Sequence, residues 1–270
     1  MKLHNRIRSV AIGSFDGMHV AHRALSSRAE SLVVIERQEG YPRLTPGYKR
    51  SWYCDKPMAF YLFEKVRSLS PEAFVARLRE DYPALERIVV GYDFRFGRGR
   101  EGSLETLERC FDGVLEVIPE VTVAGISVHS RTIRELLGRG ELALANRLLG
   151  RDYVIDGEPI RGQGLGSREF VPTINLAVEG YQLPAEGVYA GMTLVNGAHH
   201  PSVIFLGHRR STDGSFAIES HLLDRRIDAV GSSVKLTFVR RLRANRTFGD
   251  FAALKRQIEA DIQAARAIVC

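Results

Sequence analysis

The order of apolar and polar positions divides the chain into two parts with different periodicity. In the first part, short apolar runs typical of buried strands alternate with amphipathic stretches of helical period. The expected strands are residues 9–13, 32–35, 87–91 and 114–118, and the expected helices are 21–30, 57–69, 71–82, 103–110, 132–139 and 141–149. Strands separated by helices predict a parallel sheet with helical crossovers.

After residue 150 the pattern changes to short alternating segments separated by glycine and proline. The segments are YVIDGEPI, GVYAGMTLV, PSVIFLG, FAIESHLL and SVKLTFV, all between residues 153 and 239. This pattern predicts an antiparallel barrel or sandwich. Residues 248–269 form one amphipathic stretch and predict a C-terminal helix. We therefore expect two domains, 1–150 and 151–270.

Composition narrows the functional classes. No window approaches the roughly 18 apolar residues that a membrane span needs, and no export signal is expected, so we expect no membrane partner. Cys54, Cys110 and Cys270 lack the spacing of a disulfide or zinc framework, which favours a cytoplasmic location. The net charge is +6, without a basic stripe interleaved with aromatic residues. Phosphate-bearing small molecules are therefore the expected anions, rather than nucleic acid.

The segment VAIGSFDGMHVAH (10–22) places two histidines where a strand hands over to a helix. Gly13 allows close backbone approach, and such a corner directs helix N–H groups at an anion. Imidazole donors from His19 and His22 can bind a polyphosphate and stabilise charge that forms during transfer. The alternative is a pair of ordinary surface or capping histidines.

Two further segments carry candidate chemistry in the second part. The glycine-rich stretch GQGLGSREFVPTINL (162–176) can fold over phosphates. Thr173 and Asn175 share one face of an extended segment and offer oxygen ligands that Mg²⁺ accepts, although the same residues also suit a turn into a strand. Glu219 and His221 project from one face of an expected strand, either as a site or towards solvent.

Several motifs together resemble one known family. GSFDGMHVAH, GYDFRFG with REG (91–102) and SRTIR (130–134) resemble the HxGH nucleotidyltransferases, and in the GxFDGxH form the bacterial bifunctional riboflavin kinase/FAD synthetases. The glycines at 157 and 162, PTIN, GVYAG and ESHLLD follow the order of that family's kinase module. The resemblance implies an α/β Rossmann-like nucleotidyltransferase domain, followed by an antiparallel riboflavin kinase-like β-barrel with a C-terminal helix.

The resemblance also implies the reactions: phosphorylation of riboflavin to FMN and adenylylation of FMN to FAD, with ATP and Mg²⁺. Glu219 matches the family's catalytic base, and His19 and His22 match its catalytic histidines. The matching phosphate-binding positions are Gly13, Phe15, Asp16, Gly17, Ser130, Arg134, Gly162 and Gly166. Asp93, Arg95, Arg100 and Arg209 match the flavin or nucleotide pocket, and Thr173 and Asn175 match the metal ligands.

The chain departs from the family pattern at both predicted sites. Ala21 stands where the family has glycine, His129 replaces a serine, and Arg131 and Thr132 invert the usual order. Phe205 and Arg210 replace an asparagine and a proline. Two alternatives follow: an enzyme that retains one of the two activities, or a flavin- or nucleotide-binding regulator without turnover. Retention of both histidines, Thr173, Asn175 and Glu219 disfavours the regulator.

Overall fold

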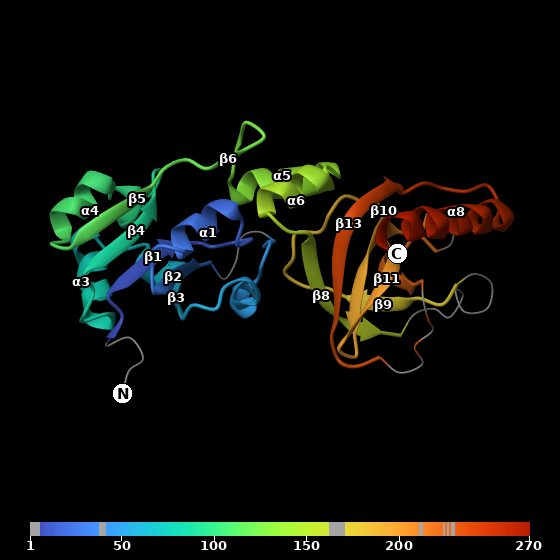
Figure 1. Cartoon of the computed structure of the whole chain (residues 1–270), viewed down its shortest axis with the longest axis horizontal. Coiled ribbons are helices and arrows are strands. Elements are labelled where there is room, and N and C mark those ends of the chain that lie inside the picture. The colour runs from blue at the N-terminus through green and yellow to red at the C-terminus, as the bar shows by residue number, and fades with distance from the viewer. Residues whose placement is uncertain are drawn as a thin grey trace. The chain divides into compact units, whose positions relative to one another are not determined.

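The chain forms two compact units, Met1–Thr132 and Ile133–Cys270 (Figure 1). The computed structural model describes residues 6–37, 42–161, 171–210, 213–223, 225, 227 and 230–270. Among these residues, no helix has the length and apolar character needed to cross a bilayer. The predicted domain boundary near residue 150 stays a prediction.

The first unit contains a five-stranded parallel sheet, as the alternation of strands and helices predicts. Its strands are β1 (Ser9–Gly13), β2 (Ser31–Glu36), β3 (Met58–Leu62), β4 (Arg87–Gly91) and β5 (Val114–Ile118). They are arranged in the order β3-β2-β1-β4-β5, with all neighbours parallel. The chain therefore continues to one side of β1 through β2 and β3, and then returns to its other side through β4.

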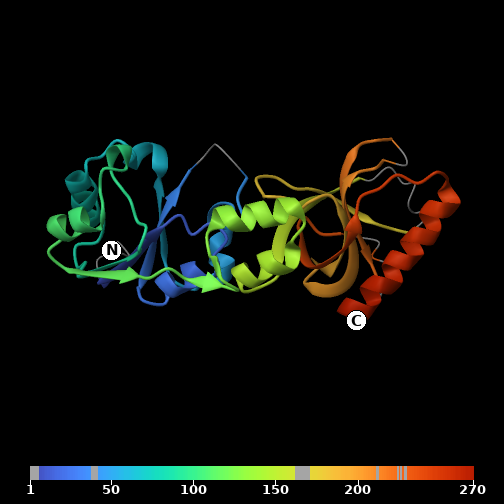
Figure 2. The same cartoon turned by 90° about the horizontal axis from the view of Figure 1, so that it is seen from above.

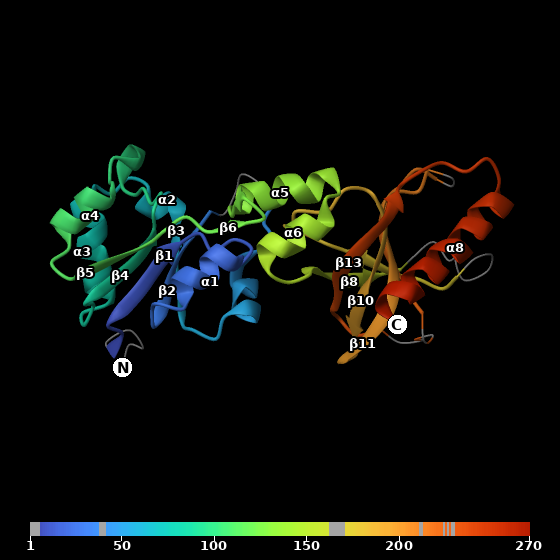
Figure 3. The ribbon, with the colours of Figure 1, turned by 45° about the horizontal axis from the view of Figure 1, so that its top comes forward.

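Helices cover both faces of this sheet (Figure 3). They are α1 (Val20–Ser26), α2 (Phe63–Val66), α3 (Pro71–Asp81) and α4 (Leu104–Cys110), with short 3₁₀ segments η2 (Gly47–Tyr53) and η3 (Arg98–Arg100). The sequence specifies their starts: the side chains of Ser70 and Ser103 accept hydrogen bonds from the first-turn N–H groups of α3 and α4. A small hairpin, β6 (Thr122–Val123) and β7 (Ile126–Ser127), precedes α5 (Ser130–Arg139), which continues into the second unit.

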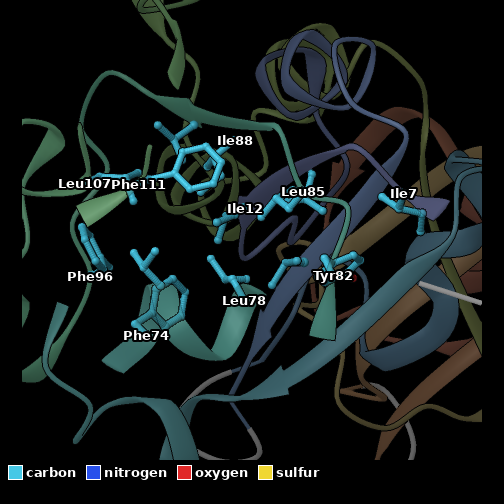
Figure 4. Packing of buried hydrophobic residues seen from close by; sticks show 14 residues of the cluster. Ile7, Ile12, Phe74, Leu78, Tyr82, Leu85, Ile88, Phe96, Leu107 and Phe111 are labelled. Atoms are coloured by element: carbon cyan, nitrogen blue, oxygen red, sulfur yellow. The ribbon is translucent and has the colours of Figure 1, made fainter. Parts of the chain in front are cut away.

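Two apolar clusters hold the layers together, one on each face of the sheet. Ile12 of β1 packs with Phe74 and Leu78 of α3 in the larger cluster (Figure 4). The neighbouring Ala11 packs instead with Leu25 of α1. Because successive strand side chains point to opposite faces, β1 is buried on both sides and reads as a continuous apolar run.

The second unit is a closed six-stranded antiparallel barrel with helices packed against it (Figure 2). Its elements are α6 (Leu142–Leu149), β8 (Tyr153–Ile160), β9 (Ile174–Ala177), β10 (Gly187–Val195), β11 (Ala198–His208), β12 (Phe216–Leu222), β13 (Val234–Ala244) and α8 (Phe251–Val269). The barrel order is β10-β11-β12-β9-β8-β13. The guanidinium of Arg243 on β13 donates to both carboxylate oxygens of the buried Asp261, which fastens α8 to the barrel.

The helix expected over residues 57–69 is wrong in its first half. Residues Met58–Leu62 form β3, and only Phe63–Val66 is helical. Pairing with β2 supplies ladder hydrogen bonds to this segment, and the carbonyl of Pro57 accepts a bond from the Leu32 N–H at 2.9 Å. Proline suits the first residues of an edge strand as well as those of a helix, so tertiary pairing decided between the two.

Candidate active sites

The first candidate site is a cavity of about 230 Å³ at the carboxyl ends of β1 and β4. The sheet order reverses between these two strands, and such switch points are where open α/β sheets bind ligands. The polar lining residues include His19, His22, Asp93, Ser127, His129 and Ser130. Within the described part of the chain, no lysine or arginine lines this cavity.

The loop between β1 and α1 is held in an unusual backbone conformation. Phe15 and Met18 have φ angles of 50° and 41°, which non-glycine residues rarely adopt, and Gly17 has a φ of 92°. Phe15 and Met18 are fully buried, so their packing stabilises the conformation. The predicted residues Phe15 and Gly17 therefore shape the corner that presents the histidines, and Gly13 lines the cavity.

Asp16 ties this corner to a segment nearly thirty residues later. Its buried carboxylate accepts hydrogen bonds from the N–H groups of Leu44 and Thr45 at 2.8 and 3.0 Å. The Gly17 N–H donates to the Thr45 hydroxyl at 2.7 Å. The structure thus gives Asp16 a supporting role, and its phosphate contact stays a prediction.

A buried arginine that the sequence did not indicate supports the same loop. The Nε of Arg50 donates to the carbonyl of Ser14 at 3.0 Å, and its Nη1 pairs with the Glu36 carboxylate at 2.6 Å. Burial is the main influence on both groups, because it lowers the pKa of Arg50 and raises that of Glu36. No local motif marks Arg50, since its partners are distant in the sequence.

His19 has a fixed orientation and a defined tautomer. Its Nδ1 accepts the His22 backbone N–H at 3.3 Å and so caps α1. Its Nε2 lies 3.3 Å from the hydroxyl of Ser130, which itself donates to the Asp16 carbonyl at 2.7 Å. Ser130 therefore accepts from His19, and the imidazole is neutral with its proton on Nε2.

His22 is the ring that remains available to a ligand. It stacks on His19 with centroids 3.5 Å apart, and its Nδ1 is buried without a hydrogen-bond partner in the described structure. Burial, followed by the nearby His19, Arg50 and His129, lowers the pKa of His22 well below its usual value. At neutral pH the site therefore holds His22 uncharged.

A third imidazole lines the cavity at the position where the family pattern has serine. The Nε2 of His129 lies 2.9 Å from the Ser127 hydroxyl and 3.4 Å from the Tyr92 hydroxyl. Tyr92 also lines the cavity. Tyr92 and His129 were not among the expected site residues, although the sequence showed His129 as a departure from the family pattern.

The remaining predicted residues of this site divide into two groups. Asp93 lines the cavity, as does Ala21, whose methyl group replaces the family's glycine. Arg95 and Arg100 are exposed and do not line it. Arg134 lies one helical turn after Ser130 on α5 and belongs to the second unit.

The second candidate site lies on the barrel, where β9 and β12 pair antiparallel. Glu219 is directly opposite Asn175 in the register. The Asn175 side-chain amide donates to the Thr173 hydroxyl at 3.3 Å, and the His221 Nδ1 lies 2.9 Å from the Pro172 carbonyl. The structure thus brings the PTIN segment against the strand that carries Glu219. PTIN is also the entry to a strand, since β9 begins at Ile174.

Arg209 joins these residues. Its Nε and Nη2 donate to the same oxygen of Glu219, Oε1, at 2.9 and 2.6 Å, and Nη2 also donates to the Asn175 carbonyl oxygen at 2.7 Å. Both side chains of the ion pair are about four-fifths buried. The two other predicted phosphate-binding residues, Gly162 and Gly166, lie outside the described residues.

Comparison with known proteins assigns each part of the chain to a family. The FAD synthetase family model matches residues 54–132, and the riboflavin kinase model matches residues 149–269. A bifunctional riboflavin kinase/FMN adenylyltransferase of Pseudomonas fluorescens is 31% identical, over 95% of this chain and 91% of its own length. This chain belongs to the bifunctional riboflavin kinase/FMN adenylyltransferase family. The family predicted from the motifs is thereby confirmed.

Other relatives of this bifunctional family agree. The relative from Listeria monocytogenes is 29% identical, over 96% of this chain and 91% of its own length. A solved structure of a protein named as a macrolide-efflux protein, from Streptococcus pneumoniae, superposes with a TM-score of 0.86 at 24% identity, over 97% of this chain and 95% of that one. That likeness supports the fold.

Proposed function

We propose that this chain phosphorylates riboflavin to FMN at the barrel and adenylylates FMN to FAD at the cavity of the first unit, with ATP as the donor in both reactions. Family membership and the two matched family models support both activities. The observation that carries the proposal is the presence of two distinct polar sites of different chemistry. One is a pair of stacked imidazoles beside a cavity, and the other is a carboxylate opposite an amide on a barrel wall.

At the barrel, Glu219 is the proposed general base. Its carboxylate accepts the proton of the ribityl 5′-hydroxyl while that oxygen bonds to the γ-phosphorus of ATP and ADP leaves. The register that places Glu219 opposite Asn175 holds the base beside the predicted phosphate-binding segment. Acceptance of one proton by one carboxylate balances the transfer.

The neighbouring oxygens fit Mg²⁺ in their chemistry. The Thr173 hydroxyl oxygen and the Asn175 side-chain carbonyl oxygen are neutral oxygen ligands within one short segment. Mg²⁺ is usually held by one or two protein groups together with substrate phosphates and waters. The Asn175 oxygen accepts one bond from Arg209 and keeps a second lone pair. We propose Thr173 and Asn175 as the protein ligands, and the ion would neutralise phosphate charge there.

In the first unit, a phosphate oxygen of FMN attacks the α-phosphorus of ATP and pyrophosphate leaves. This step needs positioning and charge stabilisation rather than covalent catalysis. His22 offers its uncharged ring to the phosphates, while His19 is committed to capping α1 and to Ser130. We propose that His22 contacts the phosphates directly and that His19 orients it through ring stacking.

The proposal includes the domain division near residue 150, with adenylyl transfer assigned to 1–150 and the kinase to 151–270. It also includes a cytoplasmic location, and small-molecule substrates as partners in place of nucleic acid or a membrane. Cys54, Cys110 and Cys270 are free, which suits a reducing compartment.

One experiment tests the activities. Purified protein is incubated with riboflavin and MgATP, and separately with FMN and MgATP, and the flavins are resolved by chromatography. We expect FMN and FAD in the first reaction and FAD in the second. FMN alone in the first reaction would restrict the chain to the kinase, and FAD formed only from supplied FMN would restrict it to adenylyl transfer. Quenched flavin fluorescence without any product would indicate the regulator.

A further inference from the structure

We propose that Arg209 is the positioning residue of the kinase site. It binds one carboxylate oxygen of Glu219 and leaves the other for the substrate hydroxyl. It also links β12, the strand that carries Glu219, to the Thr173–Asn175 segment. This inference rests on the proposed kinase function. It gives Arg209 a role different from the pocket contact that the family resemblance implies.

Hydrogen bonds to residues 214 and 215 hold the backbone of Arg209 in place. Arg209 directly follows β11, and its N–H donates to the Ser215 carbonyl at 2.8 Å. Its own carbonyl accepts the Gly214 N–H at 3.1 Å, and its Nη1 donates to the Ser215 hydroxyl at 2.7 Å. These contacts place the guanidinium on the β11–β12 connection, directed at β12.

The Nε and Nη2 groups of the guanidinium donate to the paired strands β12 and β9. Both bonds to Glu219 end on Oε1, whereas no described residue donates a hydrogen bond to Oε2. A carboxylate that acts as a general base needs a fixed orientation and one oxygen free to accept the proton. The planar guanidinium fixes the orientation through Oε1 and leaves Oε2 free. Oε2 of Glu219 is thus the atom that accepts the hydroxyl proton.

The same guanidinium couples the base to the predicted metal ligands. Its Nη2 reaches the carbonyl oxygen of Asn175, whose amide contacts the hydroxyl of Thr173. One side chain therefore sets the spacing between the proton acceptor and the oxygens proposed to hold Mg²⁺. Displacement of reacting groups by about 1 Å is enough to cost on the order of a hundredfold in rate.

The pairing also decides against a direct role of Arg209 in binding phosphate. The Arg209 guanidinium pairs with the Glu219 carboxylate at 2.6 Å, so that carboxylate largely neutralises its positive charge. A phosphate-binding arginine would change the KM for ATP when it is removed. A positioning arginine would change kcat and leave KM nearly unaltered, because it acts through Glu219 in the reacting complex.

The test compares Arg209→Gln, Arg209→Lys and the matched control Arg240→Gln. Arg240 is an exposed arginine of β13 that is assigned to neither site. We expect Arg209→Gln to lower the kcat of riboflavin phosphorylation about tenfold to a hundredfold, with the KM for ATP within about twofold of wild type. Arg209→Lys restores part of the rate, since lysine keeps the charge and loses the fork. Arg240→Gln is expected to match wild type.

A double variant gives an independent measurement. In a Glu219→Gln background, Arg209→Gln is expected to lower the residual rate by less than about twofold, because residues that act as a unit are not additive. A merely structural role would lower the rate by the same factor in both backgrounds. Conversion of supplied FMN to FAD by the same preparations shows that the chain is folded.

Three results would overturn the inference: a raised KM for ATP at unchanged kcat, an unchanged kcat in Arg209→Gln, or full additivity in the double variant. If Arg209→Gln fails to fold, Arg209→Lys carries the same comparison. The proposed function is tested separately by the wild-type protein. Absence of FMN formation there would reject the kinase, whereas FMN formation with an unaffected Arg209→Gln variant would reject only the role of Arg209.

Discussion

The two candidate sites of this chain differ in their electrostatic character. The cavity of the first unit is lined by imidazoles, of which His22 is held uncharged, and it contains no lysine or arginine among its described lining residues. The barrel site is built around a full ion pair between Arg209 and Glu219. The difference follows from the chemistry proposed for each: adenylyl transfer needs donors for an anion, whereas the kinase needs a proton acceptor.

The largest effect expected from this contrast is the loss of the base. Glu219→Gln keeps the shape of the side chain but cannot accept a proton, so FMN formation should fall at least about a hundredfold. Conversion of supplied FMN to FAD should stay within about twofold. The matched control is Glu158→Gln, at an exposed carboxylate on β8. Equal loss of both reactions would show that the two sites are not separate.

The reciprocal change removes the imidazole of the first site. His22→Ala takes away the ring that is proposed to contact the phosphates, and FAD formation from FMN should fall on the order of a hundredfold. FMN formation from riboflavin should be preserved. His199→Ala, at an exposed histidine of the barrel, is the control for a general loss of imidazole. A normal rate of FAD formation in His22→Ala would remove the histidine from the mechanism.

The neutrality of His22 also predicts how stability depends on pH. Its pKa is lower in the folded chain than the usual 6.5, so the unfolded chain binds the extra proton as the pH falls below about 6.5. This costs up to about 1.4 kcal/mol per pH unit until the folded-state pKa is reached. Thermal unfolding at pH 7.5 and pH 5 should therefore show a smaller acid destabilisation in His22→Asn than in wild type. An identical loss in both proteins would contradict the burial of a neutral ring.

The smallest effect concerns the methyl group of Ala21 on the cavity wall. Ala21→Gly enlarges the site and should raise the rate of FAD formation a few-fold, at a cost of about 1 kcal/mol in helix stability. Ala24→Gly, on the same helix but not lining the cavity, carries the same helix cost without the gain in space. A lower rate in Ala21→Gly than in Ala24→Gly would mean that the methyl group contributes to binding.

Local pattern was sufficient for most of the fold. The apolar run of β1 and the serine caps of α3 and α4 depend on neighbouring residues. The alternating segments after residue 150 predicted a barrel or a sandwich, and the structure has a closed barrel. Residues 57–69 misled because Pro57 suits the start of either element. The partner that makes Met58–Leu62 a strand is β2, more than twenty residues earlier.

Sequence motifs predicted only some of the residues at the two candidate sites. His19, His22 and Ser130 come together as the resemblance implies, and so do Thr173, Asn175 and Glu219. The motif also included Asp16, and what it did not indicate is that this carboxylate holds the backbone of residues 44 and 45. Other features of the sites depend on contacts between segments that are distant in the sequence, so local spacing does not predict them. They are the hydrogen bond from Arg50 to the β1–α1 loop, the contact between Tyr92 and His129 at the cavity, and the ion pair of Arg209 with Glu219.

The bonds between Asp16 and residues 44 and 45 have a practical consequence for dissecting this protein. The matched FAD synthetase region begins at residue 54, after both the histidine corner and the segment that props it. A fragment cut to that region would keep Asp93, His129 and Ser130 yet lose His19 and His22. One that joined residues 6–37 directly to residue 54 would leave the buried Asp16 carboxylate without its amide donors. Any minimal adenylyl-transfer fragment must therefore carry residues 42–53, although no catalytic group is assigned to them.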